Sequence, residues 1–179
     1  MKHKIMVAYK SSTGFTKKYA EAISNELNGT LVEYKDATAE LMSGCHTVVF
    51  GSRAHAGRID GYKKIKDTFQ KSSAHKLALF VTGATPATAK STIEGFWAQN
   101  LSPKELESTP HFYMPSGLCY EKMSLPDKLM MKMAATMMKK KKNKTAQDLA
   151  FEQAISASYD ISDMSYIKPL VACLKHPEK

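Results

Sequence analysis

A chain of 179 residues is long enough to form a single domain, residues 1–179, with a sizeable hydrophobic core. Its 43% hydrophobic and 24% charged residues are ordinary for a globular protein, which excludes a fibrous or disordered chain. The net charge of +9 favours an anionic partner or surface, and no apolar run reaches the roughly 18 residues of a membrane span, so a cytoplasmic location, with or without membrane association, is expected.

The first part of the chain predicts a strand, a helix and a second strand. Residues 4–9 are apolar and strand-like, and residues 15–27 place their apolar side chains on one face of a helix. Asn28-Gly29 is suited to end that helix, because both residues tolerate a left-handed backbone. A weaker strand is predicted at residues 30–35.

The alternation continues through the next part of the chain. The predicted elements are a short central strand, a helix, a buried strand, another helix, a fifth strand and a last helix, at residues 47–50, 60–72, 77–81, 87–100, 111–115 and 164–175. Such alternation predicts a parallel sheet with helices on both faces. Trp97 falls inside one of these helical patterns and is expected in the core.

A basic insert rich in methionine and lysine, residues 116–160, interrupts this order between the fifth strand and the last helix. Ser124 can cap a helix over residues 125–144, and no acidic residue lies between Asp127 and Asp148. Three roles remain open for this helix: packing on the sheet edge, contact with a second copy in a homodimer, or peripheral contact with a membrane through its methionines and lysines.

Ligands of parallel sheets bind beyond the carboxyl ends of the strands. Three segments rich in glycine and small residues are predicted there, residues 11–16, 51–57 and 82–86. The first, Ser11-Ser12-Thr13-Gly14-Phe15-Thr16, lacks both GxxxxGK[ST] and GxGxxG. Its single glycine and alternating hydroxyls suit one terminal phosphate at a helix N-terminus. The alternative is that Ser12 or Thr13 merely caps the helix.

The pattern Ser-x-Thr-Gly-x-Thr after a first strand resembles the phosphate loop of flavodoxins, and the two later segments fall where that family places its flavin loops. Within the family, the long basic insert is most similar to the group that includes menaquinone-dependent protoporphyrinogen dehydrogenase. The resemblance implies a flavodoxin-like three-layer α/β/α sandwich with a five-stranded parallel sheet and a helical insert. It also implies the cofactor FMN.

The resemblance assigns cofactor-binding positions in all three segments. Phosphate contacts are expected from the first segment, and contacts with the two sides of the isoalloxazine from the second and third. The residues are Ser11, Ser12, Thr13, Gly14, Phe15 and Thr16; Ser52, Arg53, Ala54 and His55; and Thr82, Gly83 and Ala84. No role in catalysis is assigned, and the spacing of cysteines and histidines predicts no metal site.

The predicted flavin loops depart from those of electron-shuttling flavodoxins, which sandwich the flavin between aromatic side chains. Residues 51–57 and 82–86 contain no aromatic residue, which predicts a more open flavin. Arg53 could stabilise reduced flavin, or it could face solvent. His55 could relay a proton, or it could be a surface residue without a functional role.

These observations predict an FMN-dependent flavoprotein that acts in electron transfer or oxidises or reduces a small molecule, with a quinone or an anionic tetrapyrrole as candidates. The alternatives are an electron carrier without its own substrate and a flavin-free binding domain on the same fold. Nucleic acid is not expected as a partner, because residues 128–144 contain no aromatic side chain for stacking.

Overall fold

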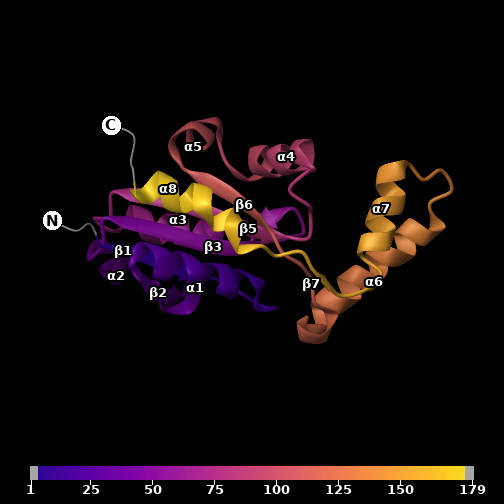
Figure 1. Ribbon diagram of the computed structural model, residues 1–179, viewed down its shortest axis with the longest axis horizontal. Coiled ribbons are helices and arrows are strands. Elements are labelled where there is room, and N and C mark those ends of the chain that lie inside the picture. Colours follow the sequence, from indigo (N-terminus) through magenta and orange to yellow (C-terminus); the bar gives the residue numbers. More distant parts are fainter. Residues whose placement is uncertain (1–3, 176–179) are drawn as a thin grey trace.

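The computed structural model describes residues 4–175 and shows a central parallel sheet with the insert projecting from one end (Figure 1). Its strands pair in the order β2-β1-β3-β5-β6. The bounds are Thr30–Glu33, Ile5–Tyr9, Thr47–His55, Lys76–Gly83 and His111–Pro115. The order reverses between β1 and β3, which is the switch point where sheets of this type bind ligands. The predicted flavodoxin-like sheet is confirmed.

Alternating side chains of the strands supply two hydrophobic cores, one on each face of the sheet. In β1, Met6 and Ala8 point to one core, and Val7 and Tyr9 to the other, because successive strand residues face opposite ways. Full burial of one large apolar side chain stabilises the fold by about 1.5–3 kcal/mol. The two cores therefore fix the register of the sheet.

The helices cover both faces, which completes the three layers. One face carries α1 (Phe15–Leu27) and α8 (Lys168–Lys175), whose buried residues join the core of Val7. The other carries α2 (Ala39–Ser43), α3 (Tyr62–Gln70) and α4 (Lys90–Asn100). Trp97 of α4 is buried in that second core, as predicted.

The predicted end of the central strand is wrong. β3 runs on to His55 and folds back through a tight turn onto β4 (Arg58–Ile59) as a hairpin. The turn residues Ala56 and Gly57 have positive φ values of 47° and 75°. Antiparallel pairing of Ala54 with Ile59 extends the strand through what the sequence suggested was a loop.

Other boundaries differ from the prediction where local turns take over. β2 ends at Glu33 and passes into a 3-10 turn, η1 (Tyr34–Asp36). The last helix begins as a 3-10 turn, η3 (Met164–Ile167), before α8. The short helices α2 and α5 (Pro103–Ser108) were not predicted, because each is only one or two turns long; α5 is held by a capping box between Ser102 and Glu105.

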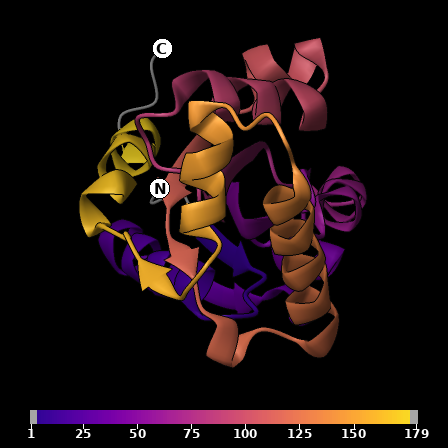
Figure 2. The same cartoon turned by 90° about the vertical axis from the view of Figure 1, so that its right-hand side faces the viewer.

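The insert contains a helical hairpin held at its base by a small sheet. α6 (Leu125–Lys140) and α7 (Ala146–Ala154) form the hairpin, and β7 (Gly117–Leu118) pairs with β8 (Tyr159–Asp160). The side chain of Ser124 caps α6 as predicted. The helix predicted over 125–144 ends at Lys140, and a capping box at Thr145 starts the separate helix α7. Figure 2 shows the two helices in front of the carboxyl edge of the sheet.

Within residues 4–175, no helix combines the length and the apolar character that crossing a bilayer requires.

Candidate functional site

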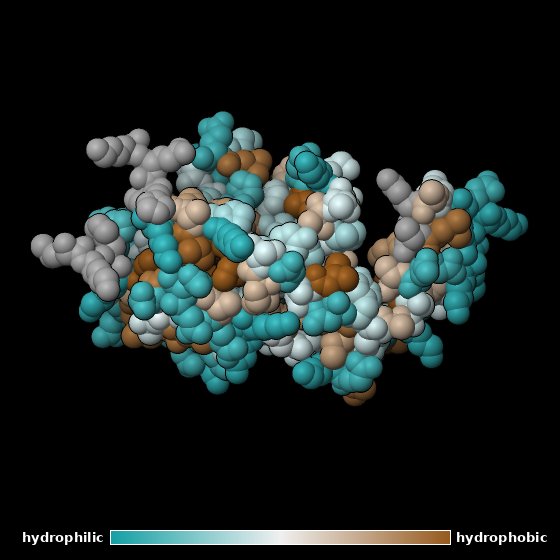
Figure 3. Space-filling view, in the orientation of Figure 1, coloured by the Kyte–Doolittle hydropathy of each residue, from teal (hydrophilic) through white to brown (hydrophobic). Residues whose placement is uncertain are grey.

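A cleft of about 430 Å³ lies between the carboxyl ends of the strands and the insert. This volume is within the range of sites for small molecules, roughly 300–1,000 Å³. The three predicted segments all contribute to its lining, through Ser12, Thr13, Phe15, Thr16, Arg53, Ala54, His55, Ala56, Gly57, Thr82, Gly83, Ala84 and Thr85. The space-filling view shows the insert as a separate lobe across a notch from the body (Figure 3).

The first segment forms an open turn at the start of α1. Gly14 is the N-cap residue with a φ of 99°, a left-handed conformation that glycine adopts at little cost, and no side chain caps this helix. Capping by Ser12 or Thr13, the alternative to phosphate binding, is therefore wrong. Ser11 instead supports the turn, because its Oγ accepts a hydrogen bond from the Gly14 amide at 3.2 Å.

The two threonines of this segment have different surroundings. Thr16 is 2% exposed, and its hydroxyl shares a 2.8 Å hydrogen bond with the hydroxyl of Thr82 at the end of β5. This bond ties the first segment to the third. Thr13 forms no hydrogen bond to any described residue through its hydroxyl, and it lines the cleft. Thr13 is thus the threonine that can bind a ligand directly.

A second hollow, of about 470 Å³, adjoins the cleft at the N-terminus of α1. Thr13 and Phe15 line both spaces, so the two hollows are neighbours at the turn. The hollow is also lined by Lys18 and Lys122. The carboxylate of Asp160 lines the hollow as well and lies 3.9 Å from Lys18 Nζ, so Lys122 is the lysine of this lining that forms no ion pair with a described residue. An uncapped helix N-terminus beside it favours an anionic group at this end of the cleft.

The second segment supplies cleft residues unevenly. Ser52 is fully buried, and its hydroxyl donates to the backbone carbonyl of Asp60, so its side chain does not line the cleft. Arg53, Ala54 and His55 do line it, from the extended end of β3. The hydroxyl of Ser52 thus supports the hairpin, and the expected position of this residue against the flavin ring stays a prediction.

A chain of alternating charges runs across this edge, from the end of β1 to the insert. Asp60 accepts hydrogen bonds from Lys10 Nζ at 2.6 Å and from Arg53 Nε at 3.3 Å. Asp127, at the first turn of α6, accepts from Arg53 Nη1 at 2.7 Å and contacts His55 Nε2 at 3.0 Å. Arg53 is thus paired with two carboxylates, so its guanidinium does not face solvent without a partner.

The charges hold both carboxylates in the ionised form. Burial by itself would raise the pKa of Asp60, but Lys10 and Arg53 more than offset it and lower that pKa below its usual range. The Arg53 hydrogen bond is the main cause that lowers the pKa of Asp127, against the opposing effect of burial. An ionised carboxylate only accepts hydrogen bonds, so His55 Nε2 carries the proton in its contact with Asp127.

Aromatic side chains reach the cleft from outside the two predicted flavin loops. Phe15, Tyr113 of β6 and Phe151 of α7 line it, so the cleft is not as poor in aromatic residues as residues 51–57 and 82–86 suggest. Tyr113 lies against Gly83: a Cβ at that glycine would come within 2.4 Å of the tyrosine hydroxyl. The absence of a side chain at Gly83 therefore provides room for Tyr113, while Gly83 itself also lines the cleft.

The insert contributes a wall that the sequence did not assign to the site. Its lining residues include Met123, Asp127, Met130, Met131, Ala134, Phe151 and Ile155. On α6, Asp127, Met130, Met131 and Ala134 follow the three-to-four-residue spacing of one helix face, which is the signal that could have been read from sequence. Nothing in the sequence indicated that this face would meet the end of β3.

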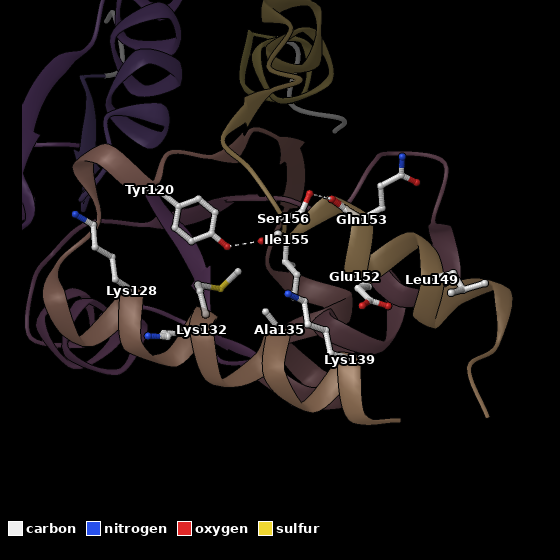
Figure 4. Close-up of a pocket in the computed structure, with 11 residues that line it drawn as sticks. Tyr120, Lys128, Lys132, Ala135, Lys139, Leu149, Glu152, Gln153, Ile155 and Ser156 are labelled. Carbon is white, nitrogen blue, oxygen red and sulfur yellow. Dashed lines mark hydrogen bonds between the residues drawn. The ribbon is translucent and has the colours of Figure 1, made fainter. Parts of the chain in front are cut away.

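A groove of about 710 Å³ runs between α6 and α7 and meets the cleft at Met131 and Ile155, which line both (Figure 4). Three lysines of α6, at positions 128, 132 and 139, line the groove. Its floor carries the apolar residues Met131, Ala135 and Ile155. The Tyr120 hydroxyl, which donates to the Ile155 carbonyl, fixes one end of the groove.

Among residues 4–175, no group of three or more His, Cys, Asp or Glu side chains is arranged to hold a metal ion.

The doubly wound sheet, its uncapped first turn and a cleft at the switch point define a nucleotide-binding α/β domain of the flavodoxin type. The family model for the flavodoxin domain matches residues 6–145, most of the chain. The chain belongs to the flavodoxin-domain family. This match does not assign it to the protoporphyrinogen dehydrogenase group, and none of the curated proteins matches it.

Several solved structures are similar to the chain at low identity. A WrbA-like flavodoxin from Agrobacterium tumefaciens is 19% identical, with 70% of this chain and 87% of that chain covered and a TM-score of 0.42. A flavodoxin from the domain Archaea is 15% identical, with 86% and 99% covered and a TM-score of 0.44. A flavoprotein in complex with FMN from Lactobacillus acidophilus is 16% identical, with 63% and 92% covered and a TM-score of 0.43.

The residues at the switch point fit the cofactor of this family. Flavodoxins hold FMN where the strand order reverses, and this chain offers its cleft there. The open turn at Gly14, the unpartnered Thr13 hydroxyl and the hollow beside Lys18 suit the phosphate, while the cleft suits the ring. FMN is the cofactor of this flavodoxin-domain protein.

Proposed function

We propose that the chain is a redox flavoprotein that holds FMN between its strand ends and its insert and transfers electrons to or from a small molecule. The observation that carries the proposal is the turn at Ser12–Phe15. It leaves α1 without a side-chain cap and opens on both the cleft and the lysine-flanked hollow. A phosphate in the hollow and a flavin ring in the cleft would lie on either side of this turn.

The residues of the chain would act by binding and orienting the cofactor. Thr13 and the first amides of α1 would bind the phosphate, and Arg53, His55 and Tyr113 would border the ring. FMN itself supplies the chemistry of accepting and donating electrons. The protein would set the electrostatic environment through the Lys10–Asp60–Arg53–Asp127 chain, whose charges largely cancel.

We infer the class of substrate from the groove between α6 and α7. Its apolar floor meets the flavin cleft at Met131 and Ile155. Its three lysines outnumber its one carboxylate, Glu152, which is paired with Lys144 at 2.6 Å, and so favour an anionic group. An apolar ring compound could therefore lie along the groove with one edge in the cleft. An anionic tetrapyrrole matches the floor and the lysines, and a quinone matches the floor.

We also propose that α6 docks the protein on an anionic lipid surface. Leu125, Leu129, Met133 and Met137, spaced by four residues, form an apolar stripe on α6 and are 82%, 60%, 60% and 67% exposed. Lysines flank this stripe, and each lysine near an anionic bilayer contributes about 1 kcal/mol. The excess of positive charge favours an anionic bilayer over a second copy of this basic chain, which would repel it.

The phosphate assignment is tested by Thr13→Val, with FMN and riboflavin as paired ligands because riboflavin lacks the phosphate. Loss of a hydrogen bond to a charged group costs about 1.5–3 kcal/mol, so FMN affinity should fall by roughly 10- to 100-fold. Riboflavin affinity should not change. Binding is measured by quenching of flavin fluorescence, and the exposed Thr136→Val on α6 is the matched control.

Equal losses for FMN and riboflavin in Thr13→Val would contradict the phosphate assignment. A wild-type chain that takes up neither flavin would contradict the proposed function itself.

A further inference from the structure

Asp127 joins the insert to the body at the cleft. It is 7% exposed, although α6 is otherwise largely on the surface. Among the described residues, its bonds to Arg53 and His55 are the only side-chain hydrogen bonds between α6 and the rest of the α/β body. One carboxylate therefore provides the polar contacts that join α6 itself to the end of β3.

The position of Asp127 is itself fixed by local structure. It is the third residue of α6, and its amide donates to the Oγ of the capping Ser124 at 3.3 Å. A negative charge in the first turn is stabilised by the helix dipole. The carboxylate thus arrives at the cleft on a rigid helix end rather than on a loop.

The two donors that Asp127 holds both border the proposed flavin ring. Arg53 lies between Asp60 on the hairpin and Asp127 on the insert, so its guanidinium is clamped from two sides. The side chain of His55 is 35% exposed. Its contact with Asp127 determines which of its two ring nitrogens carries the proton. Without Asp127, neither side chain would have a partner on the insert.

We propose that Asp127 is a positioning residue that docks the insert over the flavin cleft and holds Arg53 and His55 in place beside the flavin ring. This proposal rests on the proposed FMN site. The Asp127 carboxylate also balances the positive charge of Arg53. It therefore lowers the tendency of the site to stabilise the reduced flavin, which is more negative than the oxidised one.

The proposal is tested with Asp127→Asn, Asp127→Glu and the control Asp148→Asn in the full chain loaded with FMN. Asp148 matches Asp127 closely, because it is the third residue of α7, lies on the same insert and is paired with a lysine at 2.6 Å. The readouts are the midpoint potential of bound FMN and its dissociation rate constant.

Asp127→Asn should shift the potential upward, because one negative charge beside the ring is lost, and should speed FMN dissociation by about tenfold or more. Asp127→Glu keeps the charge and should restore most of the wild-type potential, which a merely structural role would not predict. Asp148→Asn should match the wild type in both readouts. Unchanged values in Asp127→Asn, or equal changes in Asp148→Asn, would overturn the proposal.

Amide hydrogen exchange of the flavin-free protein tests docking separately from FMN binding. Asp127→Asn should speed exchange across residues 123–131 relative to the wild type and Asp148→Asn, while the core strands keep their protection. Unchanged exchange at 123–131 would overturn the docking of the insert, whether or not the chain binds FMN. Absence of FMN binding in the wild type would instead contradict the proposed function.

Discussion

The α/β body and the insert are stabilised by different interactions. In the body, large side chains such as Val7, Phe50 and Phe80 are completely buried in two cores. In the insert, the helix α6 exposes Leu129 and Met133 by 60% each. The insert is held by polar contacts at its edges, such as the 3.0 Å hydrogen bond that the Tyr159 hydroxyl donates to the Ala84 carbonyl.

A rigid cofactor site can thus be covered by a wall that is stabilised separately. Burial of many apolar side chains makes the body cooperative and places the strand ends accurately. Few buried contacts let a region open at a free-energy cost far below that of global unfolding. The insert can therefore cover the cleft without adding to the core of the body. A substitution in one region should leave the stability of the other largely unchanged.

The largest expected effect is loss of stability when the body core is opened. Phe80→Ala should lower the free energy of unfolding by about 3–5 kcal/mol, because it removes a fully buried ring that packs directly over Gly51. Met133→Ala on α6 should change it by no more than about 0.5 kcal/mol, since that side chain is mostly exposed. Urea unfolding measures both, and similar losses would show that the insert belongs to the core.

A smaller effect is expected when the apolar stripe of α6 is made polar. Leu129→Ser combined with Met133→Ser and Met137→Ser should leave urea unfolding nearly unchanged and abolish flotation of the full chain with anionic vesicles. Leu41→Ser, an exposed leucine of the body at 48%, is the control and should keep flotation. Neutral vesicles should recruit the wild type less than anionic ones.

Two results would contradict docking on a membrane. One is a wild type that does not float with anionic vesicles. The other is a wild-type dimer in size-exclusion chromatography that the triple variant dissociates without any vesicle binding, which would assign the stripe to a second copy of the chain.

Much of the body could be predicted from sequence because its signals are local. The helix at 15–27 follows from apolar periodicity and its Asn28-Gly29 ending, and its bounds agree with α1. The turn at Gly14 could be placed because one glycine and several hydroxyls between a strand and a helix are typical of an anion site. The insert helix could be started at Ser124 for the same kind of reason.

The parts that could not be predicted depend on contacts distant in sequence. The hairpin that lengthens β3 arises from pairing with β4. Asp127 is 74 residues from Arg53 in the sequence, and it enters the site only because α6 folds back over the strand ends. Tyr113 lies on a strand that looked like ordinary core, yet its hydroxyl reaches the cleft through the space that Gly83 leaves. Local patterns in the sequence contain no information on these approaches.

The central claim is that FMN binds between the strand ends of the body and the wall of the insert. Hydrogen exchange of the wild-type chain with and without FMN tests it most directly. The account predicts slower exchange on FMN binding in four segments, residues 11–17, 53–56, 82–85 and 123–131. Protection confined to the body, with none at 123–131, or no protection in any of these segments would contradict it.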